Sequence, residues 1–280
     1  MRALWLLLLG VAVVLAWPCT VRGAFNHSDW DAVLKKYVDT NGEIAGIKEN
    51  VFDYEALRRN QEPLFYSYLE AVEKADLSTL TTREDQLAFW INVYNAFAVK
   101  MVVENPCKVQ FGRFCWPIRS IRDVGAYGKT NWVLPVGKVA GKTYSLDDVE
   151  TTLRNMGDYR IHTCIVCASV SCPNLQAYAY HPSILDAQMN TSAEAFLNTT
   201  GKGLELNSDS GVATVSAIFD WFAADFEKQY TSVKVFLSLY SWEVQDFLKT
   251  HNLKELTLKY YDYDWRLNSK SSSHVKYAWY

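Results

Sequence analysis

The sequence lacks several features that define common classes of protein. Beyond residue 24, no stretch approaches the ~20 uninterrupted apolar residues of a membrane-spanning helix, so we expect no transmembrane segment. No long block of lysine and arginine is present, and we therefore expect no nucleic-acid partner. A glycine-rich phosphate loop, a Gly-x-Ser-x-Gly nucleophile elbow and a His-Glu-x-x-His metal motif are also missing. We accordingly predict no cofactor and no resident metal.

Residues 1–23 have the pattern of a secretory signal peptide. A positive charge near the start, an apolar core over residues 4–16 and small residues at the end place the predicted cleavage after Gly23. Loss of the two cations Arg2 and Arg22 would take the formal charge from −3 to −5. We predict a secreted or lumenal protein. Glycosylation sequons fit that compartment and begin at Asn26, Asn190 and Asn198.

The remaining pattern predicts an α+β fold, with a single domain over residues 24–268 and a C-terminal tail over residues 269–280. The clearest helix is predicted over residues 82–104, opened by a capping box at 81–84 and apolar nearly all round, as expected of a buried central helix. Several packing helices and a small mixed or antiparallel sheet should surround it. Helices are predicted over 28–38, 53–57, 64–75, 145–156, 183–197, 219–226 and 233–249, and strands over 132–136, 138–144, 161–167, 204–206 and 212–215.

Five cysteines remain after removal of the signal peptide, an odd number that leaves at least one thiol free or paired with another chain. Cys107 and Cys115 flank a short glycine-containing loop and are predicted to form a local disulfide. The other three lie within residues 159–173. This stretch is apolar and β-branched up to Cys167, so it is predicted to be a buried strand that ends in a small-residue loop.

Two amides on the predicted central helix, Asn92 and Asn95, share one face. A buried asparagine costs stability unless its amide is hydrogen-bonded, so each must have partners. The amides either bond a neighbouring loop or orient a substrate or a catalytic imidazole.

Several short motifs are distinctive when taken together. They are Phe52–Leu57, Ala88–Ala96, Leu146–Glu150, Asp158–His162, Cys167–Leu175, Leu185–Gln188 and Tyr263–Asn268. With these motifs the chain resembles domain-of-unknown-function family 547, over about residues 28–268. The family usually has proline where Tyr159 stands and glycine where Ala168 stands, departures that concern turn geometry more than chemistry. The resemblance implies a fold but no established reaction.

The reactive groups of residues 159–173 suggest acyl-transfer chemistry. Cys172 follows small residues and precedes a predicted helix, a position that favours a thiolate. His162 can serve as its base, with Asn92 or Asn95 orienting the imidazole. We therefore predict Cys172, His162, Asn92 and Asn95 as the catalytic residues of a thiol-dependent hydrolase or acyl transferase that acts on a small-molecule or peptide substrate.

Other interpretations stay open. In the main alternative, Cys167 and Cys172 form a disulfide in a non-catalytic secreted binding or structural protein, and Cys164 is buried and inert. A zinc site could use the three central cysteines with His162 or His181, but Cys164 and Cys167 would point to opposite faces of a regular strand. A redox motif at 164–167 is disfavoured because such motifs belong at the start of a helix.

Overall fold

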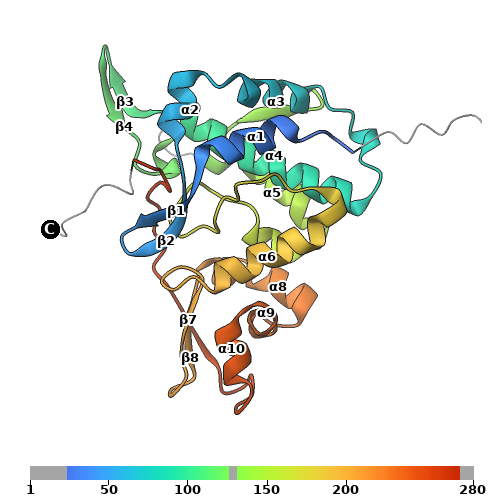
Figure 1. Cartoon of the computed structure of the whole chain (residues 1–280), viewed down its shortest axis with the longest axis vertical. Coiled ribbons are helices and arrows are strands. Elements are labelled where there is room, and N and C mark those ends of the chain that lie inside the picture. The colour runs from blue at the N-terminus through green and yellow to red at the C-terminus, as the bar shows by residue number, and fades with distance from the viewer. Residues whose placement is uncertain (1–23, 126–130, 272–280) are drawn as a thin grey trace, which may run out of the picture.

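A long helix, α4 (Arg83–Glu104), organises the structure. In the computed structural model, which describes residues 24–125 and 131–271, α4 is buried along most of its length (Figure 1). The prediction of a buried central helix is therefore confirmed. Its capping box lies one position later than predicted, because the Asp85 N–H donates to the Thr82 hydroxyl and the Thr82 N–H donates to the Asp85 carboxylate, both at 3.0 Å.

Four helices pack with α4 around the larger of the hydrophobic clusters. They are α1 (Ser28–Tyr37), α2 (Tyr54–Asn60), α3 (Pro63–Glu73) and α5 (Leu146–Arg154). All four coincide with predicted helices. The start of α5 is fixed by a capping box in which the Asp148 N–H donates to the Ser145 hydroxyl (3.1 Å) and the Ser145 N–H donates to the Asp148 carboxylate (2.8 Å).

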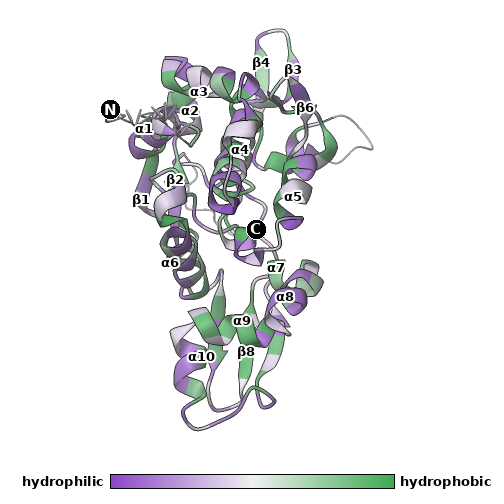
Figure 2. Ribbon diagram, turned by 90° about the vertical axis from the view of Figure 1, so that its right-hand side faces the viewer, coloured by the Kyte–Doolittle hydropathy of each residue, from purple (hydrophilic) through white to green (hydrophobic). Residues whose placement is uncertain are grey.

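A second hydrophobic cluster lies below the first along the long axis (Figure 2). It is formed by helices and by a three-stranded sheet of order β7-β8-β9, in which β7 and β8 are antiparallel and β8 and β9 are parallel. The predicted mixed sheet is this one. The elements are α6 (Leu185–Leu197), β7 (Leu204–Asn207), β8 (Val212–Val215), α7 (Ile218–Trp221), α8 (Ala223–Tyr230), α9 (Val233–Tyr240), α10 (Trp242–Phe247) and β9 (Thr257–Tyr260).

Three two-stranded hairpins complete the strands of the described residues. They are β1 (Val38–Ile44) with β2 (Ile47–Phe52), β3 (Cys107–Phe111) with β4 (Phe114–Pro117), and β5 (Gly137–Val139) with β6 (Lys142–Tyr144). The first was not predicted; its turn lies at Ala45 and Gly46, which have positive φ values of 54° and 84°. The second carries the predicted Cys107–Cys115 disulfide, which is confirmed.

Several local predictions were wrong. The predicted strand over residues 132–136 does not form, because Asn131–Val133 is a 3-10 turn and the strand that follows it begins only at Gly137. The predicted helix over residues 233–249 is divided at Ser241, whose side chain caps the second of the two helices, α10. Residues 161–167 are not a strand: Tyr159–Thr163 form a short 3-10 helix, η4, capped by the Asp158 side chain, and no regular element follows. The helix predicted over residues 183–197 begins two residues later, at Leu185, because residues 182–184 form a 3-10 turn, η5 (Pro182–Ile184). The remaining 3-10 turns are η1 (Leu77–Thr79), η2 (Ile121–Asp123) and η3 (Asn131–Val133).

These elements form one compact α+β domain, as predicted. No helix in residues 24–125 or 131–271 has the length and apolar character needed to cross a membrane. The predicted signal peptide and most of the predicted C-terminal tail lie outside the described residues. The first residues of that tail continue the fold, because the Lys270 N–H donates to the Phe52 carbonyl (3.0 Å).

Candidate active site

A cavity of about 380 Å³ lies where the two hydrophobic clusters meet. Its wall combines aromatic rings, ionisable groups and the sulphur atoms of Cys167 and Cys172. The rings belong to Tyr94, Trp132, Trp221, Phe222, Tyr263 and Trp265, and the ionisable groups to Arg122, Asp147, Glu150, Arg154 and His162. An apolar pocket with a few convergent polar groups is the usual form of a small-molecule site.

The amide of Asn95 holds the loop that carries the two cysteines. It lies on α4 and is 3% exposed. Its Nδ2 donates to the Cys164 carbonyl (3.0 Å), and its Oδ1 accepts from the Val166 N–H (2.8 Å). The Asn95 side chain thus satisfies backbone groups that a neighbouring strand would satisfy in a sheet. Residues 164–166 can therefore be buried without forming a strand.

Asn92 makes the same kind of double contact with another loop. Its Nδ2 donates to the Tyr180 carbonyl (2.8 Å), and its Oδ1 accepts from the Tyr180 N–H (2.9 Å). Of the two alternatives that the sequence left open for these amides, the structure shows the first: each bonds the backbone of a neighbouring loop. Neither asparagine lines the cavity.

The segment after β9 holds the cysteine loop from its other side. The Val170 N–H donates to the Arg266 carbonyl (2.9 Å), and the Asn268 N–H donates to the Ala168 carbonyl (3.2 Å). Ala168 itself has a φ of 57°, in the left-handed region that favours glycine. This positive φ value explains why glycine is usual in the family at this position. In this chain alanine adopts the same backbone conformation.

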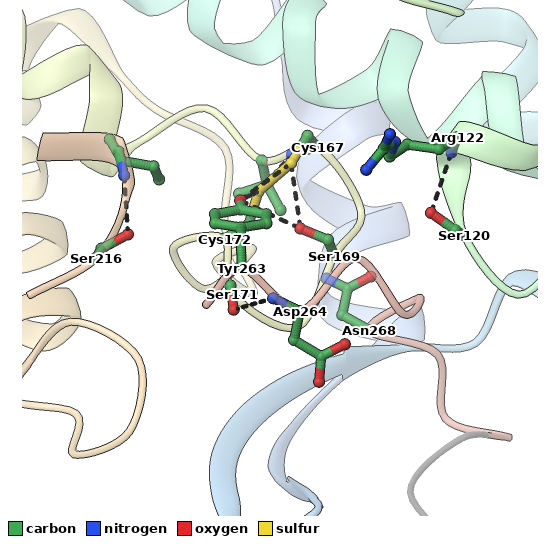
Figure 3. The surroundings of a disulfide bond; sticks show 12 residues. Ser120, Arg122, Cys167, Ser169, Ser171, Cys172, Ser216, Tyr263, Asp264 and Asn268 are labelled. Carbon is green, nitrogen blue, oxygen red and sulfur yellow. Dashed lines mark hydrogen bonds between the residues drawn. A yellow bond between two sulfur atoms is a disulfide. The ribbon is translucent and has the colours of Figure 1, made fainter. Parts of the chain in front are cut away.

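Within this loop, Cys167 and Cys172 form a disulfide whose Cα atoms are 6.3 Å apart (Figure 3). The Cys167 N–H donates to the Cys172 Sγ (3.1 Å). The hydroxyl of Tyr263 lies 3.1 Å from the Cys172 Sγ and 3.5 Å from the Cys167 Sγ. Burial raises the pKa of Tyr263, so its hydroxyl stays protonated and can act as a donor toward the sulphur atoms.

His162 lines the same cavity and is oriented by Asp225. Its Nε2 lies 2.9 Å from the Asp225 Oδ2, and its ring stacks on Phe222 with 4.0 Å between centroids. Arg154 donates to both oxygens of the same carboxylate, from Nε (2.6 Å) and Nη2 (3.0 Å). Among the described residues, the Nδ1 of His162 has no hydrogen-bond partner.

The charge states of this pair follow from burial and hydrogen bonding. Burial alone would raise the pKa of Asp225, but the hydrogen bonds from His162 and Arg154 outweigh it and hold the pKa at about 2. Burial lowers the pKa of His162 more than Asp225 raises it. An ionised Asp225 accepts a hydrogen bond from the Nε2–H group, which leaves Nδ1 as the basic nitrogen of a neutral imidazole.

Glu150 is the second group in the cavity with a shifted pKa. It lies on α5 and lines the cavity together with Tyr94 of α4. Burial raises the pKa of Glu150 to about 7, although Arg154 opposes the shift. A carboxyl group that titrates near neutrality can donate a proton in catalysis.

The raised pKa of Glu150 predicts that the stability of the protein depends on pH. The carboxyl of Glu150 ionises near 4.5 when unfolded and near 7 when folded, so the folded state binds more protons between these values and stability falls as the pH rises through them. Glu150→Gln removes this loss. Relative to wild type, the variant should gain up to about 3 kcal/mol in the free energy of unfolding between pH 4.5 and about pH 8, measured by urea unfolding. Equal differences at both pH values would contradict it, and Glu84→Gln, at an exposed site on α4, is the control.

The predicted site residues thus fall into two groups. Cys172 and His162 line one cavity, whereas Asn92 and Asn95 hold the loops behind it. Sequence reasoning missed Asp225, which lies 63 positions from His162 on α8 without any motif to join them. It also missed Glu150, although the Leu146–Glu150 motif contains it.

The third central cysteine is set apart from the cavity. Cys164 is a buried free thiol, and burial raises its pKa to about 12, so it is inert as a nucleophile at neutral pH. Within residues 24–125 and 131–271, no group of three or more histidine, cysteine or acidic side chains is arranged to hold a metal ion.

Comparison with known proteins defines a family but no reaction. Residues 77–197 match the family described as "Protein of unknown function, DUF547". This part of the chain belongs to that family, which confirms the resemblance over these residues. The matched residues 77–197 contain α4, α5, His162 and the cysteine loop, whereas Asp225 and Tyr263 lie outside them. No curated protein and no solved structure has significant similarity to the chain.

Proposed function

We propose that the chain is a secreted thiol-dependent hydrolase or acyl transferase that is active when the Cys167–Cys172 disulfide is reduced. The observation that carries the proposal is that Cys172 and an Asp225-oriented His162 line one cavity. Cysteine, histidine and an orienting acid form the usual arrangement for activating a thiol toward an acyl group.

The proposed chemistry gives each of these groups one role. A thiol reductant first converts the disulfide to two thiols. The Cys172 Sγ then attacks a carbonyl carbon, its proton passes to the Nδ1 of His162, and the Tyr263 hydroxyl donates to the developing oxyanion. The tetrahedral adduct then collapses to a thioester and expels the leaving group, to which Glu150 donates a proton. Water or an acceptor nucleophile then releases the acyl group.

The cavity wall indicates the kind of substrate. Trp132, Trp221 and Trp265 add flat apolar surface to the wall of the cavity, and the Arg122 guanidinium lies 5.0 Å from the centre of the Trp265 ring. Such a wall suits an apolar acyl group that carries an anionic end. The volume of about 380 Å³ corresponds to a small molecule or to one peptide side chain.

The test uses the full chain before and after mild phosphine reduction, with p-nitrophenyl butyrate as the acyl donor. Reduced wild type should release p-nitrophenol with a burst, Cys172→Ala should release none above background, and His162→Gln should be slower by about 10²–10⁴-fold. Cys164→Ala is the matched control, because Cys164 does not line the cavity, and it should keep its activity. Equal rates for reduced wild type and Cys172→Ala would refute the proposal.

The Cys167–Cys172 disulfide also favours a second function, that of a non-catalytic binding protein. In this case the disulfide is a permanent part of the wall, and the aromatic cavity holds a ligand without reaction. Alkylation of the native protein followed by mass spectrometry separates the two. A disulfide that resists reduction until the protein unfolds supports the binding protein, and selective labelling of Cys172 after mild reduction supports the enzyme.

A further inference from the structure

The β3–β4 hairpin projects from the main body of the molecule (Figure 1). The Cys107–Cys115 disulfide joins its strands, and Gly112 turns the chain with a φ of 57°. A short cross-linked hairpin keeps its shape without support from a core, so it can present its side chains outward at little entropic cost.

One face of this hairpin is entirely apolar. Val109 pairs with Trp116 and Phe111 pairs with Phe114, and since these pairs are two positions apart, all four side chains lie on the same face. Their exposures are 51%, 63%, 78% and 74% respectively, which makes the two phenylalanines the most exposed large apolar residues in the described part of the chain. Apolar clusters of this kind mark interaction sites.

The charged residues of the hairpin itself are basic. Residues 107–117 contain Lys108 and Arg113 and no acidic residue, although the whole chain carries −3. Lys108 is paired with Asp123 beyond the hairpin (2.7 Å), which leaves Arg113 as the cation of the tip. Arg113 lies at the turn between the two phenylalanines, and its side chain forms no ion pair or hydrogen bond with the described residues. The tip of the hairpin therefore combines aromatic and cationic groups.

We propose that this hairpin is a membrane anchor, which seats Phe111 and Phe114 among the acyl chains and Arg113 among anionic headgroups at a bilayer surface. Aromatic and basic side chains are the preferred residues of this interface. The outer edges of a two-stranded hairpin have unpaired backbone groups, so the insertion is shallow and interfacial. The proposal is independent of the chemistry at Cys172.

A lipid surface fits the hairpin better than a protein partner does. A stable protein interface takes about 800 Å² and 20–30 residues from each partner, far more than one exposed hairpin offers. A bilayer needs no complementary shape and surrounds a projecting tip on all sides. The Arg113 guanidinium at the tip complements anionic lipid in spite of the negative charge of the chain as a whole.

The test is sedimentation of the full chain with vesicles of phosphatidylcholine alone or mixed with phosphatidylserine. Wild type should bind the mixed vesicles more strongly, and salt should weaken the binding. Phe111→Ser/Phe114→Ser should lower the partition coefficient by about tenfold or more, and Arg113→Ser by about fivefold. These residues are exposed, so thermal melts should match wild type.

Leu239→Ser/Trp242→Ser is the matched control. These side chains are 50% and 60% exposed and belong to α9 and α10, which lie at the opposite end of the long axis from the hairpin (Figure 1), so the variant should bind like wild type. In addition, Trp116→Phe should remove most of the lipid-dependent shift in tryptophan emission. Absence of wild-type binding to both kinds of vesicle overturns the proposal, as does an equal loss of binding in the control variant.

Discussion

Lys202→Met should lower the free energy of unfolding by about 3–5 kcal/mol, because it leaves a carboxylate buried without its cation. The side chains of Lys202 and Glu49 are 1% and 0% exposed and form an ion pair. The Lys202 Nζ also donates to the Asn174 Oδ1 (2.6 Å). The Lys202–Glu49 ion pair connects β2 with the turn after α6, two parts of the fold that are distant in sequence.

The rest of the pair's surroundings cannot compensate for the loss. The Glu49 Oε1 is buried and has no hydrogen-bond partner among the described residues, so the carboxylate depends on Lys202. Burial raises the pKa of Glu49 and lowers that of Lys202, and both shifts reflect the cost of holding each charge away from water. In the variant, Glu49 must take up a proton in order to stay buried.

Urea unfolding at neutral pH measures the effect. Lys249→Met is the control, because it breaks an exposed pair with Asp246 and should change stability little. Replacing both partners, in Lys202→Met/Glu49→Leu, should recover much of the loss, since no unpaired charge remains. A Lys202→Met variant as stable as Lys249→Met would show that the pair contributes nothing.

Asn95→Leu should destabilise the protein by about 2–5 kcal/mol and should impair the cavity as well. Leucine has nearly the size of asparagine but cannot bond the Cys164 carbonyl or the Val166 N–H, and each buried unpaired group costs about 1–3 kcal/mol. Val166 adjoins Cys167, so the loss of the clamp should also displace the cysteine loop. Asn95 is a positioning residue by this argument.

Asn105→Leu provides the comparison, because Asn105 follows the same helix, is exposed, and donates to one carbonyl, that of Met101 (2.8 Å). Its effect on the urea midpoint should be small. A purely structural role for Asn95 would lower stability alone. A positioning role should also change the rate of Cys172 alkylation in the reduced protein, under conditions in which the variant is still folded.

The local features of the fold were predictable because they depend on near neighbours in the sequence. The capping box at Ser145 fixes the start of α5 within four residues, and the separation of eight between Cys107 and Cys115 suits a hairpin. The one-position error at the start of α4 arose because Thr81 and Thr82 are both followed by an acid three residues later. Thr81 and Thr82 are therefore equivalent capping candidates in the sequence, and the backbone conformation of the fold places the N-cap at Thr82.

The errors share a physical cause, which is that distant side chains decide the local structure. Residues 161–167 have the composition of a strand, but Asn95 provides the hydrogen bonds that a partner strand would have provided. Asp225 could not be connected with His162 because packing of α8 on η4, and no local pattern, brings them together. The presence of Cys172 and His162 in one stretch was visible in the sequence, whereas the acid that orients the histidine was not.

The contacts between the cysteine loop and the segment after β9 bear on how the protein is made. Cys167 and Tyr263 are 96 positions apart in sequence, so the loop leaves the ribosome well before the segment that holds it. Contacts of this separation form late in folding because the intervening chain must first be ordered. Until then, no folded structure determines which two of Cys164, Cys167 and Cys172 form a disulfide. The Cys167–Cys172 disulfide is therefore expected to form only after residues 263–268 have been synthesised. Substitutions in residues 263–268 should first be seen as protein with incorrectly paired cysteines.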